Sequence, residues 1–261
     1  DQPRSRGLGD VYKRQALHHL DGADATPYIV HRLDMDTSGV AVFVKKHSLV
    51  SDVARQFQEK TAKKTYLAES VGVAPPECGD SFVVDAPIGD HGIVREARTV
   101  SFDSDGKEAK TTCEIVSKKS TTLFDIMDES VAAMTTPKGV SPAPAADAAT
   151  SATAIAALVR VTPLTGRTHQ IRVHARHIGH PMLGDDTYGG GGGSAVSALT
   201  RYGVFDPKRA KALLTTIHRP MLHARTLGFT HPRTGEELHF SRDPPDDFEA
   251  FAARLAAVDE R

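Results

Sequence analysis

Short runs of strand-forming residues alternate with helical patterns from Tyr28 onward, and this alternation constrains the fold more than any other feature. The continuous apolar run 40–44 predicts a strand that is covered on both faces. The alternation within 66–71 predicts a strand with one exposed face. Further strands are expected at 110–117, 122–127, 157–162 and 225–229. The chain is therefore expected to combine a sheet with helices.

Three segments have the apolar spacing of amphipathic helices. The first spans 49–60. The second begins after Thr168, which can act as its N-cap, and runs to about Ile178, because Gly179 occupies the usual stop position. The third, 246–258, is expected to dock on the body of the protein as a surface helix.

The overall composition is that of a globular protein and excludes several classes. The 261 residues include 32 Lys+Arg and 33 Asp+Glu, which gives a net charge of −1, so binding of nucleic acid through bulk charge is excluded. Cys78 and Cys113 are too few for a disulfide framework and lack the paired spacing of a zinc site. The apolar runs are far shorter than the roughly 20 residues of a membrane span. We therefore expect a cytoplasmic protein without a membrane partner.

The domain organisation is expected to be one catalytic domain with additions. Residues 1–15 begin with Asp, lack apolar periodicity and are expected to be a non-native or disordered leader, with a natural disordered tail as the alternative. The domain spans 16–261, with a flexible insertion at 130–156 and a Gly-rich insertion at 189–217 that contains a short helix. Because the natural N-terminus is expected to be missing, an organellar or nuclear location stays open.

The first segment with candidate chemistry is HRLDMDTSG, residues 31–39, directly before the apolar run. Asp, Thr, Ser and Gly are all turn residues, so turn formation is one interpretation. A turn does not require Arg32 beside Asp34, however. The grouping of a base, a cation and two carboxylates within six residues therefore favours a functional site.

The second segment, 159–184, contains four arginines, four histidines and no acid. Arg172 and Arg176 lie one helical turn apart, and Arg residues without carboxylate partners in the sequence are suited to phosphates. A solvated basic face is the alternative. The spacing of the histidines matches no known metal-ligand pattern, so capping and phosphate contact are favoured over a metal site.

The third segment, KKTYLA, begins at Lys63 and Lys64 and contains Tyr66. A tyrosine in a strand most often serves packing. The two lysines fit either a solvated edge or a groove for a polyanion.

These three segments, in this order, resemble the RluA-type family of RNA pseudouridine synthases. HRLDMDTSG is similar to the catalytic motif of the family, KKTYLA to its tyrosine motif, and GRTHQIRVHARHIGHPMLGDDTYGG to its arginine motif. The similarity covers roughly 28–129, 157–190 and 218–248. The strand and turn that usually precede HRLD in this family are not visible before Tyr28.

The resemblance implies an α+β fold with a mixed, largely antiparallel central sheet, flanking helices and a central active-site cleft. It makes Asp34 the catalytic aspartate, places Tyr66 against the target uracil and pairs Arg172 with the aspartate. Arg32 matches the arginine that enters the space left by a flipped base. The reaction breaks the N1–C1′ bond and joins C5 to C1′, so no metal or other cofactor is expected. A covalent adduct and a glycal-like intermediate both remain open.

The expected partner is therefore a ribosomal, transfer or messenger RNA, bound by a monomer without a metal. Candidate RNA contacts besides Arg32 are Lys63, Lys64, Arg167, His169 and Arg176. Two alternatives remain: an RNA-binding relative that lacks activity, and a metallohydrolase built on the four histidines.

Overall fold

A computed structural model describes residues 27–72, 80–119, 138–142, 156–189, 207–215 and 217–259, together with 191, 193, 196, 197 and 200. The chain divides into two compact units. Unit 1 comprises residues 1–64 and 224–243, and unit 2 comprises 65–223 and 244–261. The predicted leader at 1–15 and the predicted strand at 122–127 lie outside the described residues.

Unit 1 contains short strands and one α-helix. Its elements are β1 (Tyr28–Ile29), β2 (Ser38–Gly39), β3 (Phe43–Val44), η1 (His47–Leu49), α2 (Val50–Gln58), the later part of β11 (Leu222–Thr230) and β12 (Glu237–Ser241). β1 pairs antiparallel with β3, β11 pairs antiparallel with β12, and β2 pairs with β11. The Gln56 amide fastens α2 to the end of β11, since it donates to the carbonyl of Thr230 (2.7 Å) and accepts from its N–H (2.8 Å).

The predicted helix at 49–60 is confirmed as α2, but the predicted strand at 40–44 is largely wrong. Only Phe43 and Val44 form a strand, and Ala41 is exposed rather than covered on both faces. The physical reason is that the backbone N–H of Val40 donates to the carbonyl of Ala224, and that of Val42 to a histidine side chain. The apolar run is therefore held by separate contacts instead of by one continuous ladder.

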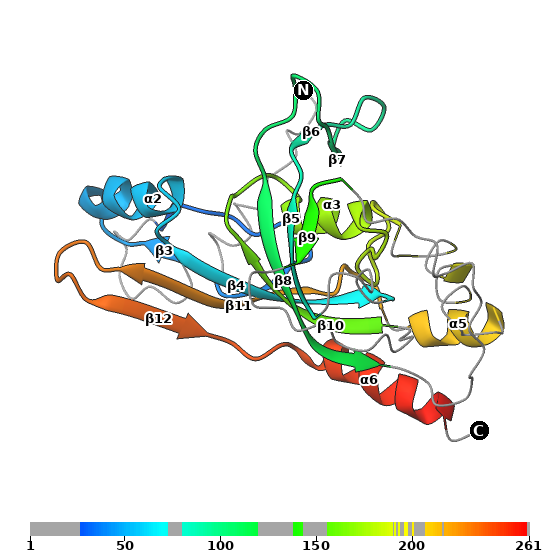
Figure 1. Cartoon of the computed structure of the whole chain (residues 1–261). Helices are drawn as coiled ribbons and strands as arrows, with labels where there is room; N and C mark the ends of the chain where they lie inside the picture. The colour runs from blue at the N-terminus through cyan, green and yellow to red at the C-terminus, as the bar shows by residue number, and fades with distance from the viewer. Residues whose placement is uncertain are drawn as a thin grey trace, which may run out of the picture. The chain divides into compact units, whose positions relative to one another are not determined.

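Unit 2 is built on an antiparallel sheet with the order β4-β10-β8-β5-β9 (Figure 1). These strands are β4 (Lys63–Val71, with 65–71 in this unit), β5 (Ser81–Asp85), β8 (Lys110–Lys119), β9 (Val140–Pro142) and β10 (Ala156–Pro163). β6 (Ile88–Asp90) and β7 (Arg98–Val100) form a separate antiparallel pair. The predicted antiparallel central sheet is confirmed, as are the strands expected at 110–117, 157–162 and 225–229.

Strand β9 corrects the prediction that all of 130–156 is a flexible insertion. Its residues pair with β5, and the Asp85 N–H donates to the Gly139 carbonyl at 2.6 Å. Gly139 has φ +84°, and a Cβ there would lie 2.2 Å from the Asp85 carbonyl oxygen. Backbone pairing of this kind does not depend on side-chain composition, which is why the Ala/Pro/Ser-rich sequence did not predict it.

The second half of strand β4, residues 68–71, is buried on both faces, although the sequence predicts one exposed face. Ala68 belongs to an apolar cluster with Phe82 and Val161, whereas Val71 belongs to a second cluster with Leu183 and Met221. The four residues 68–71 are all buried. The alternation of residue types therefore reflects two different neighbours and not one solvent face.

Three helices complete unit 2: α3 (Gln170–His177), α5 (Pro207–Leu214) and α6 (Asp246–Asp259). Ile171 and Ile178 pack into the first cluster, which confirms the predicted apolar stripe of the second helix. Phe248 and Phe251 of α6 are buried in the second cluster, which confirms its docking. None of the helices in the described ranges is both long enough and apolar enough to cross a membrane.

Candidate active site

The HRLDMDTSG segment forms a tight turn that is anchored on β11 within unit 1. The Thr37 N–H donates to the Asp34 carbonyl (3.1 Å), and Asp36 adopts φ +66°, which Asp tolerates better than most residues. The Asp34 side chain is half-buried, Arg32 is exposed and Thr37 is buried. Asp34 is therefore held on a defined turn with part of its side chain accessible.

Gly39 is required where this turn meets β11. Its φ is +119°, and a Cβ at this position would lie 2.2 Å from the Ala224 carbonyl oxygen. We expect Gly39→Ala to lower the free energy of unfolding by about 1–3 kcal/mol through backbone strain alone, with the clash added to it. Urea denaturation measures the loss. Gly235→Ala is the matched control, because Gly235 also has a positive φ (+73°) but nothing within 4 Å of its Cβ position. Equal losses in the two variants would contradict the close-approach argument.

His31 serves the fold of this turn as a neutral imidazole. Its Nε2 accepts a hydrogen bond from the Val42 N–H (2.9 Å), and its ring stacks on Phe57 at 4.5 Å between centroids. Burial, together with a smaller effect of the nearby Lys64 charge, lowers the pKa of His31 to about 4. The imidazole of His31 thus serves to hold the turn together. The carboxylate of Asp34 is left as the candidate reactive group of the motif.

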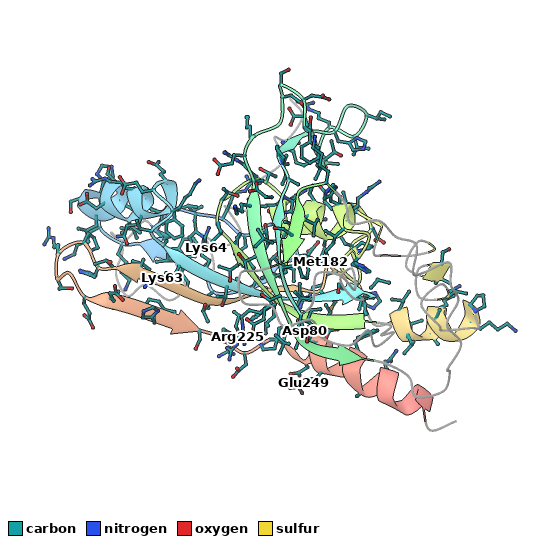
Figure 2. The ribbon with its side chains drawn as sticks, viewed as in Figure 1. Lys63, Lys64, Asp80, Met182, Arg225 and Glu249 are labelled. Atoms are coloured by element: carbon teal, nitrogen blue, oxygen red, sulfur yellow. The ribbon has the colours of Figure 1, made fainter. Side chains whose placement is uncertain are left out.

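The lysines of KKTYLA lie at the start of β4 (Figure 2). Lys63 is exposed, with its Nζ 3.9 Å from Glu237. Lys64 is half-buried, and burial lowers the pKa of its ammonium below the ordinary value. Tyr66, in unit 2, lies opposite Val161 in the sheet and packs against the first apolar cluster. The strand thus presents lysines at its beginning and a half-buried tyrosine two residues later.

The turn before α3 is locked by the Gln170 side chain. Thr165 Oγ1 donates to Gln170 Oε1 (2.6 Å), which also accepts the Arg167 N–H (3.0 Å). Gln170 Nε2 donates to the Lys110 carbonyl (2.9 Å) and to Thr111 Oγ1 (2.9 Å). The helix N-cap is His169, with φ +56° and no capping side-chain bond, so the prediction of Thr168 as the cap is wrong. The reason is that Gln170, rather than Thr168, satisfies the backbone of this turn.

The four histidines of this region have separate partners. His174 Nε2 bonds to the Ala86 carbonyl, His177 Nε2 to the Lys138 carbonyl and His180 Nδ1 to the Val71 carbonyl. Burial lowers the pKa of His174 and of His180 to about 4. Among the residues that the structure describes, no group of three or more His, Cys, Asp or Glu side chains could hold a metal ion.

Arg172 forms a buried bidentate ion pair with Asp185. Its Nε and Nη2 donate to Oδ2 (2.7 Å) and Oδ1 (2.8 Å), and its guanidinium carbon lies 5.0 Å from the centroid of the Tyr188 ring. Arg160 likewise pairs with Glu114 at 2.7 Å. The acids of both pairs lie outside the segment 159–184, so the absence of acids within that segment did not leave Arg160 and Arg172 without carboxylate partners in the fold.

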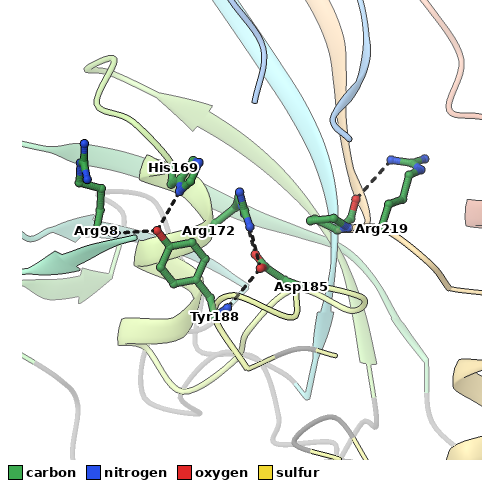
Figure 3. A network of polar contacts seen from close by, with 7 residues as sticks. Arg98, His169, Arg172, Asp185, Tyr188 and Arg219 are labelled. Atoms are coloured by element: carbon green, nitrogen blue, oxygen red, sulfur yellow. Dashed lines mark hydrogen bonds and ion pairs between the residues drawn. The ribbon is translucent and has the colours of Figure 1, made fainter. Parts of the chain in front are cut away.

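Tyr188 connects this ion pair to His169 (Figure 3). Its backbone N–H donates to Asp185 Oδ1 (3.2 Å), and its hydroxyl accepts the Arg98 N–H (2.9 Å) and bonds to His169 Nδ1 (2.9 Å). Sequence reasoning missed Asp185 and Tyr188 as site residues. The signal was their place in GDDTYGG, within the segment that matches the arginine motif.

The remaining predicted RNA contacts, Arg167 and Arg176, are exposed on and beside α3. Arg167 Nε donates to the Glu108 carbonyl (2.9 Å), which anchors one edge of its guanidinium. Unit 1 thus contains Arg32, Asp34 and the two lysines, whereas unit 2 contains Tyr66 and the arginines of the second segment. The pairing of Asp34 with Arg172 stays a prediction.

These features define a mixed α+β domain with an antiparallel sheet, an aspartate turn and a basic helix. The family model described as RNA pseudouridylate synthase matches residues 10–177, so the chain belongs to this family. This match, together with the named relatives that follow, confirms the resemblance to RluA-type synthases.

Named relatives agree with this assignment. The chain is 34% identical to RNA pseudouridine synthase 2, chloroplastic, of Arabidopsis thaliana over 86% of this chain and 45% of the relative. It is 35% identical to ribosomal large subunit pseudouridine synthase D of Nitrosomonas europaea over 93% of this chain and 55% of the relative. It is 33% identical to ribosomal large subunit pseudouridine synthase C of Yersinia pestis over 80% of this chain and 49% of the relative. The chain thus spans about half the length of these curated relatives.

A solved structure shows the same fold. Human RNA Pseudouridylate Synthase Domain Containing 1 superposes with a TM-score of 0.60 at 23% identity. The match covers 92% of this chain and 77% of the human chain.

Proposed function

We propose that this chain is the catalytic part of an RNA pseudouridine synthase that isomerises uridine to pseudouridine. The observation that carries the proposal is that the family match at residues 10–177 contains Asp34, Tyr66 and Arg172. The turn that contains Asp34 is closed by a backbone hydrogen bond, and the guanidinium of Arg172 is held by a buried ion pair. The proposal therefore rests on family membership together with defined placement of two of the three candidate groups.

In the proposed reaction the Asp34 carboxylate acts as nucleophile or as base at the target nucleotide. The N1–C1′ bond breaks, the uracil turns, and C5 bonds to C1′, while C5 loses its proton to solvent and N1 takes up a proton from solvent. Atoms and electrons balance without an oxidant, so no cofactor is needed. Tyr66 would contact the uracil, and Arg172 would keep Asp34 ionised.

The target uridine must leave its stack to reach a carboxylate, which costs a few kcal/mol. Arg32 would occupy the space that the base leaves. Phosphate contacts by the lysines of β4 and by the exposed cations around α3 would offset the cost of flipping. The proposed partner is accordingly a structured RNA.

The direct test is pseudouridine formation by the purified protein. Two of the relatives are named as ribosomal large subunit enzymes, so large-subunit ribosomal RNA is the first substrate to try, followed by transfer RNA. Mass spectrometry and chemical mapping of the RNA would reveal the product and its position. Binding of these RNAs without any product would favour the alternative of an inactive RNA-binding relative.

The role of α3 in binding phosphate gives a separate prediction. Arg176→Gln removes one exposed cation from the helix and should weaken binding of all RNA sequences to the same degree. The slope of log affinity against log salt should fall by about one, as measured by fluorescence anisotropy at several salt concentrations. Lys211→Gln, at an exposed position of α5, removes the same charge from outside the three segments and should leave the slope unchanged. Equal slopes for wild type and Arg176→Gln would contradict the contact.

A further inference from the structure

The carboxylate of Asp185 is fully buried, and Arg172, its partner, is almost as deeply buried. Both oxygens are used: Oδ2 binds Nε of Arg172, and Oδ1 binds Nη2 and the N–H of Tyr188. The Tyr188 ring lies beneath the guanidinium (Figure 3). The guanidinium is therefore held along one edge and over one face.

A buried ion pair of this kind contributes little net stability to a fold. Removing two charges from water costs about as much free energy as their attraction returns, and apolar residues of similar volume often stabilise a fold equally well. What a bidentate pair provides is a fixed orientation of the planar guanidinium. Of its five N–H donors, Asp185 takes two on one edge, so the direction of the other three is set.

We propose that Asp185 is a positioning residue for the pseudouridine synthase reaction, which it serves by fixing the guanidinium of Arg172. This inference rests on the function proposed above. In the proposed function Arg172 would pair with Asp34. Because Asp185 already balances the charge of Arg172, Asp34 would be oriented by Arg172 and would still keep the negative charge that a nucleophile or base requires.

Unit 2 contains a second ion pair of the same geometry, which provides a matched control. Arg219 Nε and Nη2 donate to Asp247 Oδ2 (2.7 Å) and Oδ1 (2.9 Å), and the guanidinium carbon lies 5.8 Å from the Phe248 ring centroid. This pair joins α6 to the segment before β11 and belongs to none of the three motif segments. Asp247→Asn therefore makes the same chemical change in the same kind of contact.

The test compares single-turnover and steady-state pseudouridine formation by wild type, Asp185→Asn, Asp185→Glu and Asp247→Asn. Folding is checked by circular dichroism, and RNA binding by fluorescence anisotropy. We expect Asp185→Asn to lower kcat about 100-fold, the scale of a misplaced catalytic group, with RNA binding within about threefold of wild type. Asp247→Asn should keep kcat within about threefold, whatever it does to stability.

A double-mutant cycle separates positioning from a merely structural role. Arg172→Lys keeps the charge but cannot form the bidentate contact. If Asp185 acts through Arg172, adding Asp185→Asn to Arg172→Lys should lower kcat by less than about threefold further, so the two costs are not additive. If Asp185→Asn does not fold, Asp185→Glu keeps the charge, displaces the carboxylate by one methylene and enters the same cycle.

Four outcomes would overturn the inference. Wild-type kcat in folded Asp185 variants, or additive costs in the cycle, would show that Asp185 does not act through Arg172, and the proposed function would stand. A kcat loss in Asp247→Asn equal to that in Asp185→Asn would show a general effect of losing a bidentate ion pair. Absence of pseudouridine with the wild-type protein on every RNA would overturn the proposed function, and this inference with it.

Discussion

Asp34→Asn is expected to abolish pseudouridine formation while the protein still binds RNA. The amide has the shape of the carboxylate but neither its charge nor its basicity, so it serves as neither nucleophile nor base. We expect the rate to fall roughly a thousandfold or more, as when a reactive side chain is removed from other enzymes. The turn itself should persist, because the hydrogen bond from Thr37 is made to the backbone carbonyl of Asp34 and not to its side chain.

The measurement is release of the proton from C5 of uridine, followed in RNA tritiated at that position. Asp52→Asn is the matched control, since it removes one exposed carboxylate from α2 in the same unit. Its rate should match that of wild type. Retained turnover in Asp34→Asn would show that the catalytic aspartate has been assigned to the wrong residue.

Acid is expected to destabilise unit 2 through its buried histidines. The pKa of His174 and of His180 is lowered to about 4 in the fold, below the ordinary 6.5. Between pH 6.5 and pH 4 the unfolded chain therefore binds more protons than the folded chain, so stability falls as the pH falls. Each histidine should cost about 2 kcal/mol at pH 5 relative to pH 7.5, which is a large part of the stability of a typical domain.

Urea denaturation between pH 7.5 and pH 4.5 measures this loss. His180→Gln keeps a polar group of similar size but cannot titrate, so its stability should depend on pH less steeply than that of wild type, by about one proton. His239→Gln, at an exposed position of β12, is the control for removing a histidine. Parallel pH curves for wild type and His180→Gln would contradict the burial effect.

Local sequence patterns predicted the elements that depend on local interactions. The apolar spacing of Val53 and Phe57 predicted α2, and β-rich runs predicted β8, β10 and β11. The run 40–44 misled because a short apolar stretch does not show whether it pairs along its whole length. Strand β9 was missed because its pairing with β5 is made by the backbone within a segment of low complexity.

The candidate site likewise contains residues that the sequence predicted and residues that it did not. The residue types and their order sufficed to select Asp34, Tyr66 and Arg172, and the family match contains all three. Asp185, in contrast, was not selected, because no spacing rule connects an arginine on a helix with an acid 13 residues later in a loop. The pairing of Asp34 with Arg172 stays a prediction.

The sequence by itself determined the family of this protein, the side chains that carry its candidate chemistry and most of its longer elements. Only the tertiary structure decided that Arg172 is bound by Asp185, that burial lowers the pKa of His31 and of His174 to about 4, and that residues 68–71 of β4 are covered on both faces. The physical reason is one of range. Periodicity and turn chemistry act over a few neighbouring residues, whereas burial and ion pairing arise from contacts between elements that lie far apart in the chain.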